Sequence, residues 1–143
     1  MSLKMPVTIR WSDLDPNAHV RHSVYYDWGA ASRIHFFYQN GIDAHYMASK
    51  NLGPILFREE AIFRREVRFG QQYFIDLEIT ALKPDFSRFS FRHTILREDD
   101  TLCATIHVDG AWIDTQLRKL TIPPAEVAAL QNKAPHAADF SWI

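Results

Sequence analysis

The chain has 143 residues and a mass of 16.6 kDa, the size of one domain. Hydrophobic residues make up 47% and charged residues 23%, which excludes a disordered chain. The net charge of −1 excludes a global field that would attract nucleic acid or an anionic membrane. The single cysteine, Cys103, excludes an intramolecular disulfide and any multi-cysteine metal site, and it suits a reducing compartment.

The sequence shows no signal-peptide pattern and no window of eighteen apolar residues, so we expect a cytoplasmic protein without a membrane span. One domain is expected over residues 1–143. In this interpretation residues 1–4 are a cloning-derived or disordered start, and residues 132–143 are a C-terminal tail.

The first strand is predicted over residues 7–11, where apolar and polar side chains alternate. Residues 12–19 contain Asp-Pro and Asn, which favour a loop. A long helix is predicted from Ser23, an N-cap residue type, to Asn40, where Asn-Gly supplies a stop. Its apolar residues occur on almost every face, which is typical of a buried helix.

Residues 42–53 are expected to be irregular or weakly helical. Four alternating segments then predict strands over residues 61–69, 73–81, 89–95 and 102–112, with Arg65 as an exception to the apolar series of the first. A short helix is expected over residues 124–131. This order predicts an α+β fold in which an antiparallel sheet wraps around the long helix. The open sheet edges favour a dimer.

The densest polar cluster lies between the first strand and the long helix, and it contains Asp13, Asp15, Asn17, His19 and His22. A carboxylate at a helix N-terminus can act together with free backbone amides that stabilise an oxyanion. The alternative is that the aspartates and Asn17 are turn and capping residues beside solvated histidines.

The stretch from Arg10 to Val20, with residues 25–28 and 30–33, resembles the N-terminal signature of the hotdog-fold acyl-CoA thioesterases. The resemblance is nearest to the 4-hydroxybenzoyl-CoA thioesterase-like family. It implies a hotdog fold, in which a curved antiparallel sheet wraps around one long central helix. It also implies hydrolysis of an acyl-CoA thioester to free acid and CoA. The implied partners are the acyl-CoA and further copies of the chain in a homodimer or homotetramer, with no cofactor beyond the CoA of the substrate.

The resemblance also implies roles for individual residues. Asp15 matches the family's catalytic carboxylate, which acts as nucleophile or general base, and the backbone amide of His22 matches the donor to the thioester carbonyl. His19 has two roles open to it, polarising Asp15 or a water, or hydrogen-bonding the loop. Asp13 is expected to be structural. Ala18 departs from the family's glycine, and Ala30 from a helix glutamate.

Candidate substrate-binding residues lie outside the loop. Tyr25 and Trp28 are candidates for an acyl pocket, with the hydrophobic core as the alternative. The resemblance implies basic residues of later strands at the CoA phosphates, and Lys83, Arg88 and Arg92 lie nearest that region. The alternative for these three is a set of solvated strand faces.

Other chemistries have weaker support. No set of histidines and carboxylates has metal-ligand spacing, so no metal site is expected, and Cys103 is expected to be a buried bystander. Two alternative functions stay open: a hotdog hydratase or dehydratase, and a non-catalytic acyl-binding module.

Overall fold

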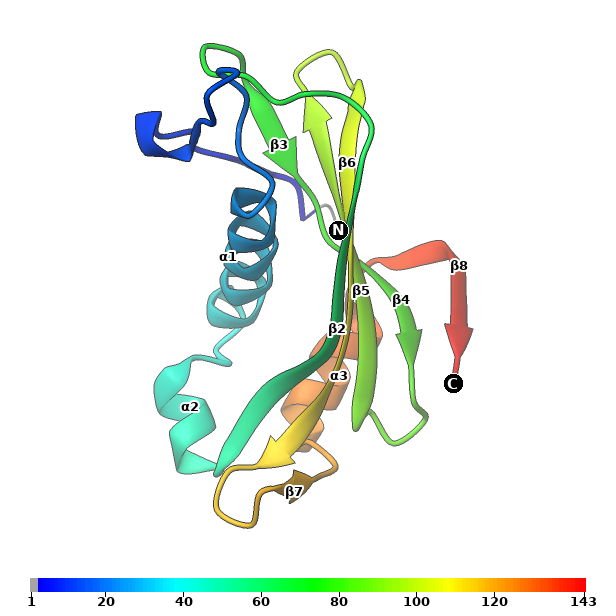
Figure 1. Ribbon diagram of the computed structural model, residues 1–143. Helices are drawn as coiled ribbons and strands as arrows, with labels where there is room; N and C mark the ends of the chain where they lie inside the picture. The colour runs from blue at the N-terminus through cyan, green and yellow to red at the C-terminus, as the bar shows by residue number, and fades with distance from the viewer. Residues whose placement is uncertain (1–2) are drawn as a thin grey trace.

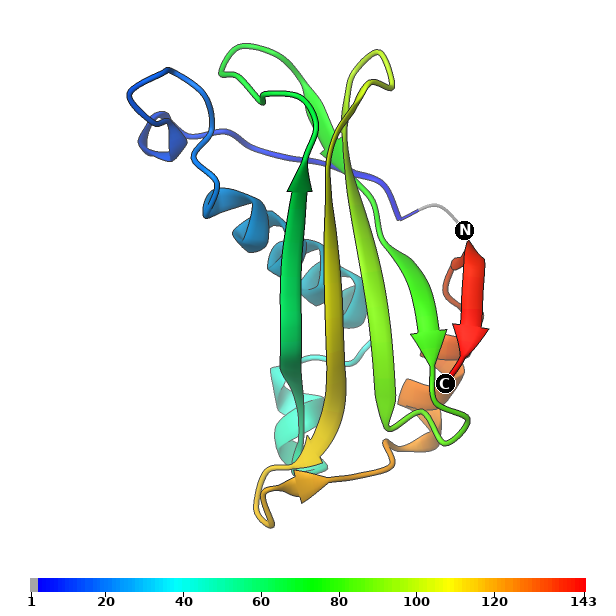
Figure 2. The same ribbon diagram turned by 45° about the vertical axis from the view of Figure 1, so that its right-hand side comes forward.

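The computed structural model describes residues 3–143 and consists of a curved sheet with one long helix against its inner face (Figures 1 and 2). The helices are α1 (Val24–Gln39), α2 (Ala44–Ser49) and α3 (Ala125–Lys133), preceded by a 3-10 turn at Trp11–Asp13. The strands are β1 (Met5–Pro6), β2 (Leu52–Phe63), β3 (Tyr73–Ile75), β4 (Glu78–Leu82), β5 (Arg88–Arg97), β6 (Leu102–Asp114), β7 (Lys119–Leu120) and β8 (His136–Trp142).

The sheet is antiparallel except at one edge. Strand β2 pairs with β6, β6 with β5, and β5 with both β3 and β4. Strand β8 adds to β4 in parallel orientation. Among the described residues β2 pairs only with β6, so the far edge of β2 is free.

Helix α1 agrees with the predicted residues 23–40 to within one residue at each end. It packs against the inner face of the sheet, where the Phe37 ring meets Phe91 and Trp112 edge-on at centroid distances of 6.2 and 5.5 Å. The expectation of a helix buried on nearly all sides is wrong for this chain, because Ile34 is 54% and Tyr38 47% exposed.

The strands predicted over residues 89–95 and 102–112 are confirmed as the centres of β5 and β6. The segment over residues 73–81 is divided into β3 and β4 at Asp76, whose carboxylate accepts a hydrogen bond from the Thr94 amide at 2.8 Å. The predicted alternation nevertheless holds across the break, because Ile75, Leu77 and Ile79 are all buried.

Two strand predictions fail, the one over residues 7–11 as a whole and the one over residues 61–69 beyond residue 63. Residues 7–11 form no strand: after Val7 donates its amide to the Tyr73 carbonyl, the chain leaves the sheet, and Trp11 is 81% exposed in the 3-10 turn. Residues 64–69 lie outside the strands, whereas β2 begins as early as Leu52. Its Gly-Pro start is tolerated because an edge strand does not need every amide.

Gly110 explains a bulge in β2. A Cβ atom at Gly110 would lie 2.5 Å from the Ile55 carbonyl oxygen, so only glycine allows β2 and β6 to approach this closely. The register shifts opposite this point, between Leu56 and Arg58. The bulge bends β2 around helix α1.

The C-terminal region combines a correct and an incomplete prediction. The helix expected over residues 124–131 is α3, which buries Val127 and Leu130. Its Gln131 accepts a hydrogen bond from the Trp112 indole at 3.2 Å, which ties α3 to the core. The tail over residues 132–143 contains β8, which no alternating pattern indicated.

Candidate active site

The loop between β1 and α1 begins at a rigid anchor, the Asp13 carboxylate. Asp13 is 1% exposed and accepts hydrogen bonds from the Arg10 amide at 2.9 Å and from Arg10 Nη2 at 2.9 Å. Burial raises the pKa of Asp13, but the bonds from Arg10 outweigh it and hold the pKa below its usual value. These contacts give Asp13 the structural role expected for it.

Asp15 closes a tight turn with one carboxylate oxygen. Oδ1 accepts from the Asn17 amide at 2.9 Å and the His19 amide at 3.2 Å. Ala18 sits at the corner with φ of +61°, the left-handed conformation that a glycine would adopt without strain. Among residues 3–143, Asp15 Oδ2 has no hydrogen-bond donor, so this oxygen is available to a substrate or a water.

The start of helix α1 leaves backbone donors free beside this turn. Within the described chain, neither the His22 nor the Ser23 amide meets a hydrogen-bond acceptor. Ser23 occupies the N-cap position, but its hydroxyl accepts from Arg21 Nε at 3.2 Å instead of capping the helix. An uncapped helix start presents N–H groups and the positive end of the helix dipole to an incoming oxygen.

Asp15 and His22 line one open pocket of about 310 Å³, whose other lining residues are His19, Val20, Tyr25, Phe63, Arg64, Arg65 and Glu66. The Tyr25 ring meets the Phe63 ring edge-on at 4.9 Å. Burial raises the pKa of Tyr25 to about 12, and the neighbouring Cys103 and Asp15 act in the same direction. Tyr25 is therefore a neutral phenol at physiological pH.

The His19 side chain contacts a residue outside its own loop. Its Nε2 lies 3.5 Å from Glu66 Oε2, and its backbone forms an isolated bridge with Arg68. The imidazole therefore joins the loop to the β2–β3 connection. These contacts favour the loop-stabilising role among the two that the sequence left open.

The other candidate binding residues lie outside this pocket. Trp28 is buried against Tyr25 at 5.3 Å. Lys83 lies at the β4–β5 turn, and the Arg88 guanidinium lies 5.1 Å from the centre of the Phe57 ring. Arg92 is bound to Glu78 and Asp139. Within one chain the structure does not bring these three cations to Asp15, and their assignment to CoA phosphates stays a prediction.

Sequence reasoning missed Val20, Arg64, Arg65 and Glu66 as pocket residues. One signal for them was present in the sequence. Arg65 interrupts the apolar series of residues 61–69, and this interruption falls where β2 ends and the chain turns toward the loop.

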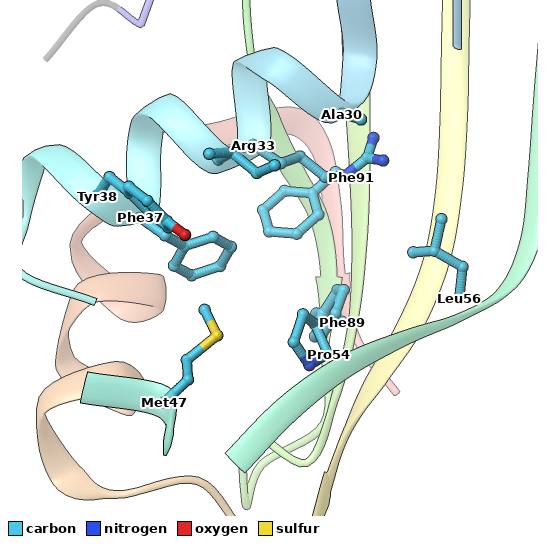
Figure 3. A pocket seen from close by; sticks show the side chains of 10 residues that line it. Ala30, Arg33, Phe37, Tyr38, Met47, Pro54, Leu56, Phe89 and Phe91 are labelled. Atoms are coloured by element: carbon cyan, nitrogen blue, oxygen red, sulfur yellow. The ribbon is translucent and has the colours of Figure 1, made fainter. Parts of the chain in front are cut away.

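A second hollow of about 200 Å³ lies along the C-terminal half of α1 (Figure 3). Its lining is apolar except for Arg33 and the Tyr38 hydroxyl: Ala30, Ile34, Phe37, Met47, Pro54, Leu56, Phe89 and Phe91. Arg33 Nη1 donates to His93 Nε2 at 3.0 Å, and Arg33 Nη2 lies 3.6 Å from Glu59. His93 Nδ1 contacts the Asp76 carbonyl at 3.0 Å.

Burial lowers the pKa of His93 to about 3, and the Arg33 charge acts in the same direction. The ring is therefore neutral, with Nδ1 donating to Asp76 and Nε2 accepting from Arg33. This arrangement holds the guanidinium at the edge of the apolar groove.

No helix among residues 3–143 has the length and hydropathy to cross a membrane. No three histidine, cysteine, aspartate or glutamate side chains of this part of the chain are grouped as metal ligands.

Comparison with solved structures identifies the fold. A hypothetical protein from Staphylococcus aureus, in complex with CoA, has a TM-score of 0.84 at 19% identity, with coverage of 96% of this chain and 89% of that one. A 1,4-dihydroxy-2-naphthoyl-CoA thioesterase from Synechocystis gives 0.82 at 15% identity, covering 93% and 97%. A gentisyl-coenzyme A thioesterase gives 0.75 at 20%, covering 91% and 98%. The sheet wrapped around α1 is thus the hotdog fold.

Comparison of sequences supplies the family. Curated protein sequences gave no significant match. The model of the thioesterase-like superfamily matches residues 9–131, which include the Asp15 loop, helix α1 and the sheet from β2 to β6. The chain therefore belongs to the thioesterase-like superfamily.

Proposed function

We propose that the protein hydrolyses an acyl-CoA thioester in the pocket that Asp15 and His22 share. The observation that carries this proposal is that Asp15 and His22 line one pocket, while among residues 3–143 Asp15 Oδ2 accepts no hydrogen bond and the His22 amide donates none. Thioester hydrolysis needs an attacking group or base on one side of the carbonyl and an oxyanion donor on the other.

In this mechanism the thioester oxygen accepts a hydrogen bond from the His22 amide, and the helix dipole stabilises its developing charge. Asp15 Oδ2 removes a proton from a water that attacks the carbonyl carbon, or it attacks the carbon itself and forms an anhydride that water then opens. In the first route, the proton that Asp15 takes from the water passes to the sulfur as the C–S bond breaks, which releases the free acid and the thiol. In the second route, the C–S bond breaks as the anhydride forms, and the thiolate takes up the proton released when water opens the anhydride to the free acid.

The choice of CoA as carrier rests on the relatives. One structural neighbour is a CoA complex, and two others are named for CoA thioesters of hydroxylated aromatic acids. The aromatic lining from Tyr25 and Phe63 in the pocket suits a flat acyl group. We propose an aromatic acyl-CoA as the first substrate to test.

A homodimer or homotetramer belongs to the same proposal. The free edge of β2 carries exposed Leu56 and Phe57, at 44% and 53%, and exposed Ile34 and Tyr38 lie on α1 beside the groove that Leu56 lines. A second copy that covers this edge would bury apolar surface and extend the sheet. Analytical sedimentation at micromolar protein concentration tests this assembly, and a stable monomer would contradict the proposed homodimer or homotetramer.

The decisive variant is Asp15→Asn, which keeps the size of the side chain and removes its charge. Loss of general-base assistance costs ~10²–10⁴ in rate, and loss of a nucleophile costs more. We measure the hydrolysis of a panel of acyl-CoAs through the release of free thiol. For Asp15→Asn we expect the rate to fall at least a hundredfold while the melting temperature is nearly unchanged.

Asp13→Asn is the matched control, because it makes the same chemical change in the same loop. Its carboxylate is held by Arg10, so we expect a lower melting temperature and a smaller loss of turnover. Near wild-type turnover in Asp15→Asn would contradict the mechanism. Acyl-CoA binding without thiol release would favour the acyl-binding module, and hydration of an enoyl-CoA would favour the hydratase.

A further inference from the structure

Residues 115–122, which connect β6 to β7 and continue past β7, form a short segment that we call the β6–β7 tip. Three of its side chains, Leu117, Leu120 and Ile122, are 69%, 46% and 64% exposed. Single exposed apolar side chains are common on protein surfaces, but a group of them in one short segment indicates a contact surface. Neither the proposed chemistry at Asp15 nor the free edge of β2 involves these residues.

The backbone of the tip is fixed by Asp114, the last residue of β6. Its Oδ1 accepts hydrogen bonds from the Gln116 amide at 2.9 Å and the Leu117 amide at 2.8 Å. The Asp114 carbonyl accepts a further bond from the Arg118 amide at 2.8 Å, and β7 then returns along β6 with Lys119 opposite Asp114. The exposed side chains are therefore carried by a backbone that is already ordered, so little chain entropy is lost when they bind.

The tip carries positive charge. Residues 115–122 contain Arg118 and Lys119 and no aspartate or glutamate. Both cations are exposed, and neither forms an ion pair among residues 3–143. The carboxylate of Asp114, which lies opposite Lys119 in the strand pairing, already accepts two backbone amides. The tip therefore offers two cations, interspersed with apolar side chains, to a negatively charged partner.

The position of the tip restricts the kind of partner. The β6–β7 turn and β7 project at the lower end of the molecule, whereas the loop that contains Asp15 lies at the upper end (Figures 1 and 2). A stable interface between proteins uses roughly 20–30 residues a side, far more than this segment provides. A projecting tip fits the surface of a lipid bilayer, where apolar groups enter the acyl region and lysine and arginine stay at the phosphates.

We propose that the β6–β7 tip docks the protein on an anionic phospholipid bilayer. Leu117, Leu120 and Ile122 enter the boundary between the headgroups and the acyl chains, and Arg118 and Lys119 contact the lipid phosphates. Both contributions are needed, because one weak membrane anchor alone gives only marginal binding. The net charge of −1 does not oppose this docking, since attraction to a charged surface acts only within a Debye length.

Co-sedimentation of the full chain with lipid vesicles tests the proposal. One set of vesicles contains phosphatidylserine and phosphatidylcholine in equal amounts, and the other contains phosphatidylcholine alone. We expect the protein to pellet with the mixed vesicles much more than with the neutral ones. We also expect this binding to weaken as the salt concentration rises, because salt screens the attraction between Arg118, Lys119 and the lipid phosphates.

Two sets of substitutions separate the two contributions. Leu117→Ser together with Leu120→Ser should lower the partition coefficient about tenfold or more, because the buried apolar groups are lost. Leu102→Ser is the matched control, since Leu102 is an exposed leucine at the opposite end of β6, and we expect no change for it. Arg118→Gln together with Lys119→Gln should remove the preference for phosphatidylserine. Melting temperatures near that of the wild type confirm that the variants are folded.

Three results would overturn the proposal. The first is a wild-type protein that does not pellet with the mixed vesicles, and the second is an equal loss of binding in the leucine variant of the tip and in Leu102→Ser. The third is a lower sedimentation coefficient of the leucine variant without vesicles, because the tip would then be a contact between copies of the chain. None of these measurements uses hydrolysis, so the membrane proposal and the thioesterase proposal fail independently.

Discussion

The polar groups near the two ends of helix α1 differ in whether they have hydrogen-bond partners within the chain. At its N-terminal end, Asp15 Oδ2 and the His22 amide have no hydrogen-bond partner among residues 3–143, and both residues line one open pocket. Along its C-terminal half, Arg33 and His93 bind each other at the edge of an apolar groove (Figure 3). In the proposed mechanism the end with unpaired groups is the reactive one, because groups that already have hydrogen-bond partners in the fold are not available to a substrate.

In the C-terminal half of α1, the hydrogen bond from Arg33 depends on a neutral His93. In the unfolded chain a histidine takes up a proton near pH 6.5, whereas burial lowers the pKa of folded His93 to about 3. Between these values the unfolded state binds one more proton, so acid favours unfolding. The stability from His93 is complete above pH 6.5 and is lost as the pH falls toward 3.

The largest expected effect is therefore the pH dependence that His93 gives to the free energy of unfolding. Its titration should lower the free energy of unfolding by about 1.4 kcal/mol for each pH unit below 6.5. His93→Gln keeps a donor and an acceptor without that titration. Urea unfolding between pH 7 and pH 4 should show a shallower slope for this variant, whatever its stability at pH 7. Equal slopes would mean that His93 takes up a proton in the folded protein.

The sequence could indicate the proposed reactive end of α1, but not the residues after β2 that line the same pocket. Asp15 and His22 belong to a turn and a helix start, which local residue types specify, and both lie in one pocket. Helix α1 was likewise bounded by Ser23 and the Asn40-Gly41 stop. Arg64, Arg65 and Glu66 follow the end of β2, where the Arg64 and Arg65 amides donate to the Cys103 carbonyl, a contact between residues far apart in the chain.

Prediction failed where tertiary contacts override alternation. Strand β2 has one free edge and exposed Leu56 and Phe57 side by side, so its pattern does not alternate and its start at Leu52 was missed. Strand β8 gains its order from pairing with β4, far away in sequence. The segment over residues 7–11 alternates well, yet most of it leaves the sheet to reach the Arg10–Asp13 anchor.

An intermediate effect concerns backbone strain in the loop that contains Asp15 and Ala18. Ala18 has a φ of +61°, which costs an L-residue roughly 1–2 kcal/mol, partly offset by the greater freedom of glycine in the unfolded chain. We expect Ala18→Gly to stabilise the protein by about 0.5–1 kcal/mol in urea unfolding. Ala48→Gly, on the exposed face of α2, is the control and should destabilise it by a similar amount. Destabilisation by Ala18→Gly would show that the turn is not strained.

The smallest expected effect tests whether the start of α1 is kept uncapped. Asp43, the N-cap of α2, accepts a hydrogen bond from the Tyr46 amide at 2.8 Å, whereas Ser23 caps nothing. Removing a working cap costs about 1 kcal/mol, so Asp43→Ala should lower the stability by that amount. Ser23→Ala should change it by less than about 0.5 kcal/mol, because it removes only the contact with Arg21. A cost for Ser23→Ala equal to that for Asp43→Ala would mean that the Ser23 hydroxyl caps the helix in solution. The amides at the start of α1 would then be less free to hold a thioester oxygen, and the contrast between the two halves of the helix would weaken.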